Sequence, residues 1–164
     1  MKIKSAYFAG GCFWGVEYFF EKLDGVKSAV SGYMGGQLNN PSYKDVCSGL
    51  SGHLEVVRVD YDENQVSYEN LTKLFFEIHD PTQSNGQGPD IGSQYLSAIF
   101  YTNEKEKNIA ENLIDILKQK NYAVATQLIS KQNNSFFEAE EYHQNYYFVH
   151  HKIPYCHSYT KRFD

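Results

Sequence analysis

The sequence lacks the features that mark membrane-spanning, exported and nucleic-acid-binding chains. No stretch is apolar for long enough to cross a membrane. The lysines near the start are followed by an apolar run too short for a signal peptide. The net charge is −5 and no run of lysine and arginine is present, which argues against a phosphate-backbone partner. We therefore expect a soluble cytoplasmic protein that binds neither membranes nor nucleic acid.

Cysteine is scarce, and its number excludes a disulfide framework. The three cysteines, Cys12, Cys47 and Cys156, cannot all pair within one chain. In a reducing compartment a disulfide is usually transient and catalytic. Repeats, low-complexity tracts and linkers are also lacking, and 164 residues suffice for one core. The sequence predicts a single domain over 1–164, with 148–164 as a C-terminal tail.

The spacing of apolar residues predicts alternating strands and helices. The expected strands span 3–9, 26–33, 54–61, 95–101 and 124–130, and the expected helices span 14–23, 67–79, 104–120 and 137–147. This order favours an α+β fold, a two-layer sandwich in which helices pack on a mixed sheet, of the ferredoxin-like split βαβ type. Two long polar loops, 35–52 and 81–93, are interpreted as walls of a site, with plain surface loops as the alternative.

The segment Gly10–Gly15, with the sequence GGCFWG, predicts a reactive thiol. Cys12 lies at a glycine-flanked turn between an expected strand and an expected helix. The free N–H groups and positive end of that helix favour thiolate over thiol. Phe13 and Trp14 follow directly, and we expect them to wall a small apolar pocket beside the sulfur. The alternative is a cysteine that acts only as a small buried hydrophobe.

A reactive thiol needs neighbouring groups that donate or accept protons. The two loops and the strand between them contain candidates. Glu55 has apolar neighbours that would desolvate its carboxyl, favour its neutral form and make it an acid near neutral pH. Asp90 lies in the second loop. The hydroxyls of Tyr43 and Tyr95 can orient a polar oxygen. The alternatives are a surface glutamate and structural tyrosines.

The remaining cysteines and the C-terminal histidines carry weaker signals. Cys156 lies in a tail that could reach a distant site, which suggests a resolving thiol, with an idle tail cysteine as the alternative. Cys47 follows Val46 and is predicted to be a buried bystander. The histidines near Cys156 match no familiar closed zinc spacing, so a metal site is disfavoured. These histidines are His143, His150, His151 and His157.

Taken together, the sequence resembles the class A peptide methionine sulfoxide reductases over nearly its whole length. The resemblance rests on seven segments in order: GGCFWGVE at 10–17, GYMGG at 32–36, PSYKDVCSG at 41–49, GHLEVV at 52–57, HDPTQ at 79–83, QGPDIGSQY at 87–95 and FEAEEYHQ at 137–144. A lone GCFWG is good evidence for this family, and the whole series is strong evidence.

The resemblance implies an activity and a role for each candidate residue. Cys12 would be the nucleophile that attacks the sulfoxide sulfur. Glu55 would protonate the sulfoxide oxygen, helped by the hydroxyls of Tyr43 and Tyr95. Asp90 would support the polar side of the pocket through hydrogen bonds. Because the sulfur is chiral, an apolar wall and a polar wall together would admit one epimer, and the family takes the S form.

The resemblance also implies how the enzyme is recycled. Phe13 and Trp14 would hold the substrate methyl group, methionine would leave, and Cys12 would become a sulfenic acid. Cys156 would then condense with it, and thioredoxin would reduce the disulfide. The implied protein is a monomeric repair enzyme for oxidised proteins that needs no metal or organic cofactor. The chain departs from the family at residues 153–154 (Ile-Pro), where many members carry a glycine before Tyr-Cys.

Three rival hypotheses stay open at the level of sequence. A cysteine hydrolase or acyl transferase would pair Cys12 with His53 as its base. A binding module without catalysis would grip methionine-rich or oxidised surfaces through Phe13 and Trp14. A structural zinc module would use the tail histidines.

Overall fold

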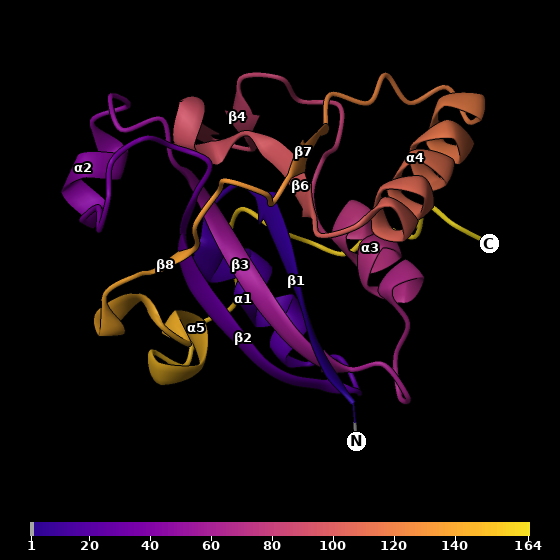
Figure 1. Ribbon diagram of the computed structural model, residues 1–164, viewed down its shortest axis with the longest axis horizontal. Coiled ribbons are helices and arrows are strands. Elements are labelled where there is room, and N and C mark those ends of the chain that lie inside the picture. The colour runs from indigo at the N-terminus through magenta and orange to yellow at the C-terminus, as the bar shows by residue number, and fades with distance from the viewer. Residues whose placement is uncertain (1) are drawn as a thin grey trace.

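A computed structural model of the protein describes residues 2–164 and shows a six-stranded sheet with helices packed against one face (Figure 1). Across the sheet the strand order is β7-β6-β1-β3-β2-β8. The strands are β1 (Ile3–Gly10), β2 (Val26–Met34), β3 (Leu54–Asp62), β6 (Ser97–Tyr101), β7 (Gln127–Ser130) and β8 (Phe137–Glu138), with β4 (Gly86–Gln87) and β5 (Asp90–Ile91) forming a separate hairpin. The helices are α1 (Phe13–Glu21), α2 (Tyr43–Cys47), α3 (Tyr68–Glu77), α4 (Glu104–Gln119) and α5 (Tyr146–Val149), with 3-10 turns at Ser93–Tyr95 and Glu141–His143.

The centre of the sheet is a split βαβ unit, as the sequence predicts. Helix α1 connects β1 to β2, and β3 lies between these two strands and pairs antiparallel with both. Strands β6 and β7 form the parallel pair of the sheet. The predicted α+β fold with a mixed sheet is therefore confirmed. Within residues 2–164, no helix has the length and apolar character needed to span a membrane.

Alternation along the strands gives the sheet two apolar faces. Phe8 of β1, together with residues of β3 and β6, packs against α1, α3 and α4. Its ring stacks on Phe20 and on Phe75, with 5.1 Å between ring centroids in each pair. The adjacent residue, Tyr7, faces the other way into a second cluster covered by Phe136. This period of two decides which face of the sheet each side chain joins.

The predicted helix over 137–147 is wrong. The segment forms β8, a 3-10 turn and the start of α5 instead, because its side chains bond to distant backbone and hydroxyl groups. Gln144 accepts a hydrogen bond from the Ser31 N–H at 2.9 Å and donates to the Ser31 carbonyl at 2.8 Å. The Glu140 carboxylate accepts from the Tyr33 hydroxyl at 2.8 Å. These contacts with β2 override the local helical spacing.

Other boundaries differ from the sequence-based expectations in smaller ways. The strand expected over 124–130 begins at Gln127, and the one expected over 95–101 begins at Ser97 after a 3-10 turn. The loop 35–52 contains α2, which begins at a capping box in which Ser42 and Asp45 exchange hydrogen bonds. The loop 81–93 contains the β4–β5 hairpin. Both loops therefore contain regular secondary structure.

One buried carboxyl in α1 lies beneath the sheet. Glu17 is 1% exposed, and its Oε1 accepts hydrogen bonds from the Asn145 N–H at 2.9 Å and from the Ser31 hydroxyl at 3.2 Å. Its Oε2 has no hydrogen-bond partner in the described part of the chain. Burial raises the pKa of Glu17 from near 4.5 to about 7. The folded state therefore holds this proton more tightly than the unfolded state does.

Glu17→Gln should make the stability of the protein less dependent on pH. Because the folded-state pKa is raised, the stabilising contribution of the proton is complete below about pH 4.5 and is lost as the pH rises through about 7. The gap between the two pKa values is worth about 3 kcal/mol. Urea unfolding at pH 5 and pH 9 measures the free energy of unfolding. Relative to the wild type, this free energy should be higher for the variant at pH 9 than at pH 5. The exposed Glu111→Gln serves as control, and a pH-independent difference for Glu17→Gln would contradict the assignment.

Candidate active site

Cys12 lies where β1 ends and α1 begins. It is the residue before the first turn of α1, and its side chain is 8% exposed. Gly11, directly before it, has φ +93°, in the left-handed region that favours glycine. A side chain at Gly11 would also press on Gln87 of the β4–β5 hairpin. The glycine therefore lets the chain turn sharply and brings the hairpin close to the thiol.

Three reactive side chains converge at this turn. The sulfurs of Cys12 and Cys156 and a carboxylate oxygen of Asp90 all lie within 4.8 Å of one another, and both cysteines are free thiols. The Tyr155 hydroxyl donates to the two oxygens of Asp90 at 3.3 and 3.4 Å. The C-terminal segment thus lies over Cys12. Three such groups are fewer than the four ligands of a closed structural zinc site, so we interpret them as a dithiol beside a carboxylate.

The expected lowering of the Cys12 pKa is wrong for this arrangement. The hydrogen bond with Cys156 and burial raise the pKa of Cys12 above its ordinary value. The backbone N–H of Trp14 acts in the opposite direction but is outweighed. The helix N-terminus is present, as the sequence predicts, but a second thiol and a nearby carboxylate disfavour a negative sulfur. Cys12 therefore rests as a thiol while Cys156 lies against it.

Glu55 is the buried acid of the site. It is the second residue of β3 and is 2% exposed, in agreement with the desolvation expected from its neighbours. Its Oε1 accepts a hydrogen bond from the Phe13 N–H at 3.2 Å, and its Oε2 has no partner among residues 2–164. Burial, followed by the nearby Cys12, raises the pKa of Glu55 well above its ordinary value. Burial thus favours the protonated form of this carboxyl, the form that has a proton to donate.

Two tyrosine hydroxyls lie near this carboxyl. Tyr43 begins α2 and Tyr95 ends the 3-10 turn after β5, and both side chains are half-buried. Burial raises the pKa of both, and the negative charge available to Glu55 adds to the effect in each case. Both hydroxyls therefore remain protonated at neutral pH. They are neutral donors on the polar side of the site, where the two loops meet.

Cys47 does not lie in the core. The predicted burial is wrong, because Cys47 is exposed at the end of α2 while the preceding Val46 is fully buried. A helix of five residues has one buried face, and Val46 occupies it. Cys47 is therefore an accessible thiol near Tyr43.

The two aromatic residues after Cys12 differ in their surroundings. Phe13 is 1% exposed and packs on Tyr33, whereas Trp14 is only half-buried. The indole N–H of Trp14 donates to Nδ1 of His143 at 3.0 Å. Its ring stacks on Tyr146 at 3.6 Å and an angle of 2°. Trp14 is thus held rigidly as the accessible apolar wall, by Tyr146, which the sequence pattern did not point to, and by His143, which it offered only as a potential metal ligand.

The structure argues against two of the rival hypotheses. His53 cannot serve Cys12 as a base because its Nδ1 accepts from the Gly36 N–H at 3.0 Å and its Nε2 donates to the Leu38 carbonyl at 2.6 Å. Over residues 2–164, the only converging group of three or more potential metal ligands is the dithiol with Asp90. Among the described residues, the tail histidines do not converge into a group of three or more potential ligands.

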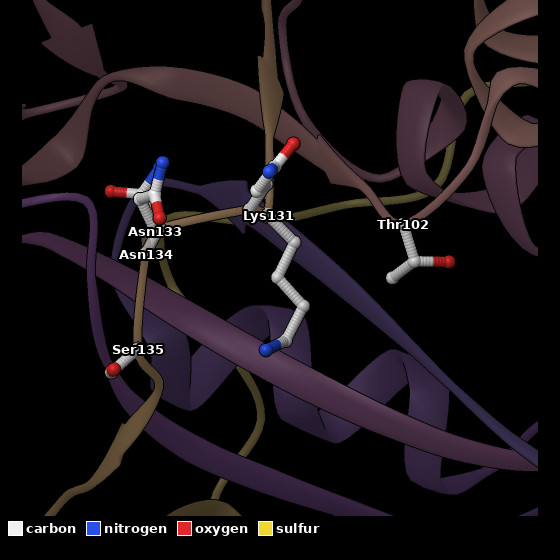
Figure 2. Close-up of a pocket in the computed structure, with 6 residues that line it drawn as sticks. Thr102, Lys131, Asn133, Asn134 and Ser135 are labelled. Carbon is white, nitrogen blue, oxygen red and sulfur yellow. The ribbon is translucent and has the colours of Figure 1, made fainter.

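A surface hollow of about 480 Å³ lies apart from this site, after β7 (Figure 2). It is lined by Thr102, Lys131, Gln132, Asn133, Asn134 and Ser135. No cysteine, histidine or carboxylate lines it, and Lys131 lies over the ring of Tyr7 with 5.2 Å between Nζ and the ring centroid. This hollow offers no groups for the chemistry that the sequence predicts.

A dithiol beside a buried carboxyl of raised pKa, on a split βαβ sheet, fits the class of oxidoreductases. The family model described as peptide methionine sulfoxide reductase matches residues 4–164. The chain is 50% identical over 151 residues to the peptide methionine sulfoxide reductase MsrA of Nautilia profundicola, across 92% of this chain and 86% of that protein. This chain therefore belongs to the peptide methionine sulfoxide reductase family.

Solved structures agree with this assignment. Mxr1 from Saccharomyces cerevisiae in reduced form superposes with a TM-score of 0.86 and 34% identity, over 99% of this chain and 93% of that one. Mxr1 in complex with Trx2 superposes with a TM-score of 0.63 and 25% identity, over 96% of this chain and 90% of that one. The fold described above is therefore shared with Mxr1, whose structure is known in reduced form and in complex with Trx2.

Proposed function

We propose that this chain reduces the S epimer of methionine sulfoxide, free or within peptides and proteins, through a sulfenic acid on Cys12. One observation carries the proposal: a buried carboxyl of raised pKa, Glu55, with an unpaired oxygen beside a buried thiol. Hydrolysis would call for a base beside the nucleophile, whereas reduction of a sulfoxide calls for an acid.

In the first step the sulfur of Cys12 attacks the sulfoxide sulfur while Glu55 protonates the sulfoxide oxygen. The proton is needed because the oxygen is a poor leaving group. Tyr43 and Tyr95 donate hydrogen bonds to the same oxygen. The substrate sulfur loses its oxygen and is reduced, and Cys12 gains a hydroxyl and is oxidised to the sulfenic acid. Trp14 holds the methyl group on the opposite side, so only one epimer presents both groups correctly.

Substrate binding has to displace the C-terminal segment from Cys12. The Tyr155 hydroxyl donates a hydrogen bond to the Asp90 carboxylate, and Cys156 lies against the nucleophile. Moving these two residues away frees Asp90 for the polar side of the pocket. It also removes the hydrogen bond that most strongly raises the pKa of Cys12. The same movement therefore admits the substrate and favours the thiolate.

In the second step Cys156 condenses with the sulfenic acid and gives a disulfide, which thioredoxin reduces. The two sulfurs already lie within 4.8 Å of each other and can return to this contact once methionine has left. A thioredoxin reductant is supported by the related Mxr1, whose structure is known in complex with Trx2. The cycle uses thiols and carboxyls throughout and needs no metal or organic cofactor.

The cellular role that fits this reaction is the repair of oxidised proteins. A cytoplasmic location, a monomeric state and the division into a catalytic domain over 1–164 with a tail over 148–164 stay predictions from the sequence. In the structure the end of that tail is anchored, because Phe163 is buried and the Thr160 N–H donates to the Glu77 carbonyl at 2.7 Å.

The test is an assay with separated epimers. Blocked S and R methionine sulfoxide are incubated with the protein and dithiothreitol, and methionine is quantified. We expect reduction of the S epimer alone, complete loss in Cys12→Ser, and wild-type rates in the exposed-thiol control Cys47→Ser. If well-folded protein reduced neither epimer, the proposed function would be wrong. Equal reduction of both epimers would refute the two-walled pocket.

A further inference from the structure

His157, the residue after Cys156, is buried and makes two directed contacts. It is 5% exposed. Its Nε2 lies 2.6 Å from the Gly10 carbonyl oxygen, and its Nδ1 lies 3.0 Å from the sulfur of Cys156. A carbonyl oxygen can only accept, so the neutral ring carries its proton on Nε2. Nδ1 is left with a lone pair directed at the thiol.

The backbone at the start of α1 holds this ring in place. Gly15 presents no side chain, and a Cβ there would overlap Nδ1 of His157. Gly11 also lies against the ring, and a Cβ there would come 3.5 Å from Nε2. Gly15, the last glycine of the GGCFWG segment, therefore makes room for a histidine from the other end of the chain. The packing of the ring against the start of α1 therefore fixes the direction of the Nδ1 lone pair.

The surroundings keep the imidazole neutral. Burial lowers the pKa of His157, opposed by its bond to Gly10 and by the negative charge of Asp90. From the end of α3, His79 also faces it, and burial lowers the pKa of His79 to about 3, so it brings no charge. The thiol of Cys156 also faces the ring, through its contact with Nδ1. A neutral imidazole beside a thiol can accept its proton.

We propose that His157 is the general base of the recycling half-reaction. When Cys156 attacks the sulfenic acid of Cys12, its S–H proton passes to Nδ1 of His157. The S–S bond forms and the S–O bond at Cys12 breaks. The departing hydroxide takes up one proton, so the proton lost by Cys156 and the hydroxyl lost by Cys12 leave together as water. The sulfur of Cys156 is oxidised and that of Cys12 is reduced. This inference rests on the proposed function.

The kinetic test separates the two half-reactions. Wild type, His157→Asn, His157→Gln and the exposed control His151→Asn are mixed with one equivalent of S sulfoxide without reductant. Quenched samples are analysed for methionine and for disulfide. We expect unchanged methionine formation in all four proteins. At pH 7 disulfide formation should be slower by about 10²-fold or more in both His157 variants, the usual size of general-base effects.

The pH profile distinguishes a base from a structural residue. At high pH hydroxide removes the thiol proton without help from a base. The difference in disulfide-formation rate between wild type and the His157 variants should therefore disappear toward about pH 10. A rate difference that stays constant with pH would show that His157 only positions Cys156, and would overturn the proposal. Equal disulfide rates would overturn it too. Absence of methionine in the wild type would instead refute the proposed function.

A measurement on the wild-type protein covers the case in which the His157 variants do not fold. Nitrogen-15 NMR of the histidine rings reports which nitrogen carries the proton. We expect His157 at pH 7 to be neutral with the proton on Nε2 and with Nδ1 free. A proton on Nδ1, or a charged ring, would leave no lone pair for Cys156 and would overturn the proposal independently of any activity.

Discussion

Glu55→Gln should slow the release of the first methionine by about 10²–10⁴-fold, the usual contribution of a positioned general acid. The glutamine side chain keeps the shape and can still accept the hydrogen bond from the Phe13 N–H. It lacks the acidic proton, and Oε2 of Glu55 is the oxygen left free to donate it. Rapid-quench analysis of methionine under single-turnover conditions measures this step without interference from recycling.

The pH dependence gives an independent check on Glu55. Because its folded-state pKa is raised, the wild-type rate should fall as the pH rises through that value, since the acid is then ionised. The fall should be absent in Glu55→Gln. The exposed Glu141→Gln should behave as wild type in rate and profile. A wild-type first-turnover rate in Glu55→Gln would assign the proton to another group, with the hydroxyls of Tyr43 and Tyr95 the nearest candidates.

Cys156→Ser should release one methionine per chain and then stop when thioredoxin is the reductant. Cys12 and the acid are untouched, so the sulfoxide is still reduced. A serine cannot form the disulfide that thioredoxin attacks. Methionine measured against enzyme concentration should show a burst of one equivalent without further turnover, whereas a small thiol such as dithiothreitol should restore turnover by reducing the sulfenic acid directly.

The exposed Cys47 provides the matched control for this experiment. Cys47→Ser should keep full thioredoxin-dependent turnover, because Cys47 lies at the end of α2 and is no part of the dithiol. Sustained turnover of Cys156→Ser with thioredoxin would remove Cys156 from the cycle. If that turnover disappeared when Cys47→Ser was combined with Cys156→Ser, Cys47 would be the resolving thiol.

The parts of the fold that the sequence predicts are those with local causes. Strands β1, β2 and β3 and helices α1, α3 and α4 each carry an apolar period that needs no distant partner to be recognised. The segment 137–147 has helical spacing too. Its conformation is set instead by bonds from Gln144 and Glu140 to β2, which no local pattern encodes.

In the candidate site, too, the features with local causes are predictable from the sequence and those that depend on distant residues are not. The turn at Cys12 and the burial of Glu55 follow from neighbours in sequence. The raised pKa of Cys12 does not, because its first cause is Cys156, from the other end of the chain. The same holds for His157, whose place depends on Gly10 and Gly15. Its position directly after Cys156 was the one signal that could have singled it out.

The position of β3 between β1 and β2 has a consequence for synthesis on the ribosome. The first two strands emerge well before β3, yet each forms its ladder with β3 and not with the other. At about 5–20 residues per second, a nascent chain spends seconds with both strands unpaired. Glu55 is carried by the strand that joins them. We therefore expect Cys12 to remain an ordinary thiol on the nascent chain until β3 docks between the first two strands and brings Glu55 to the site.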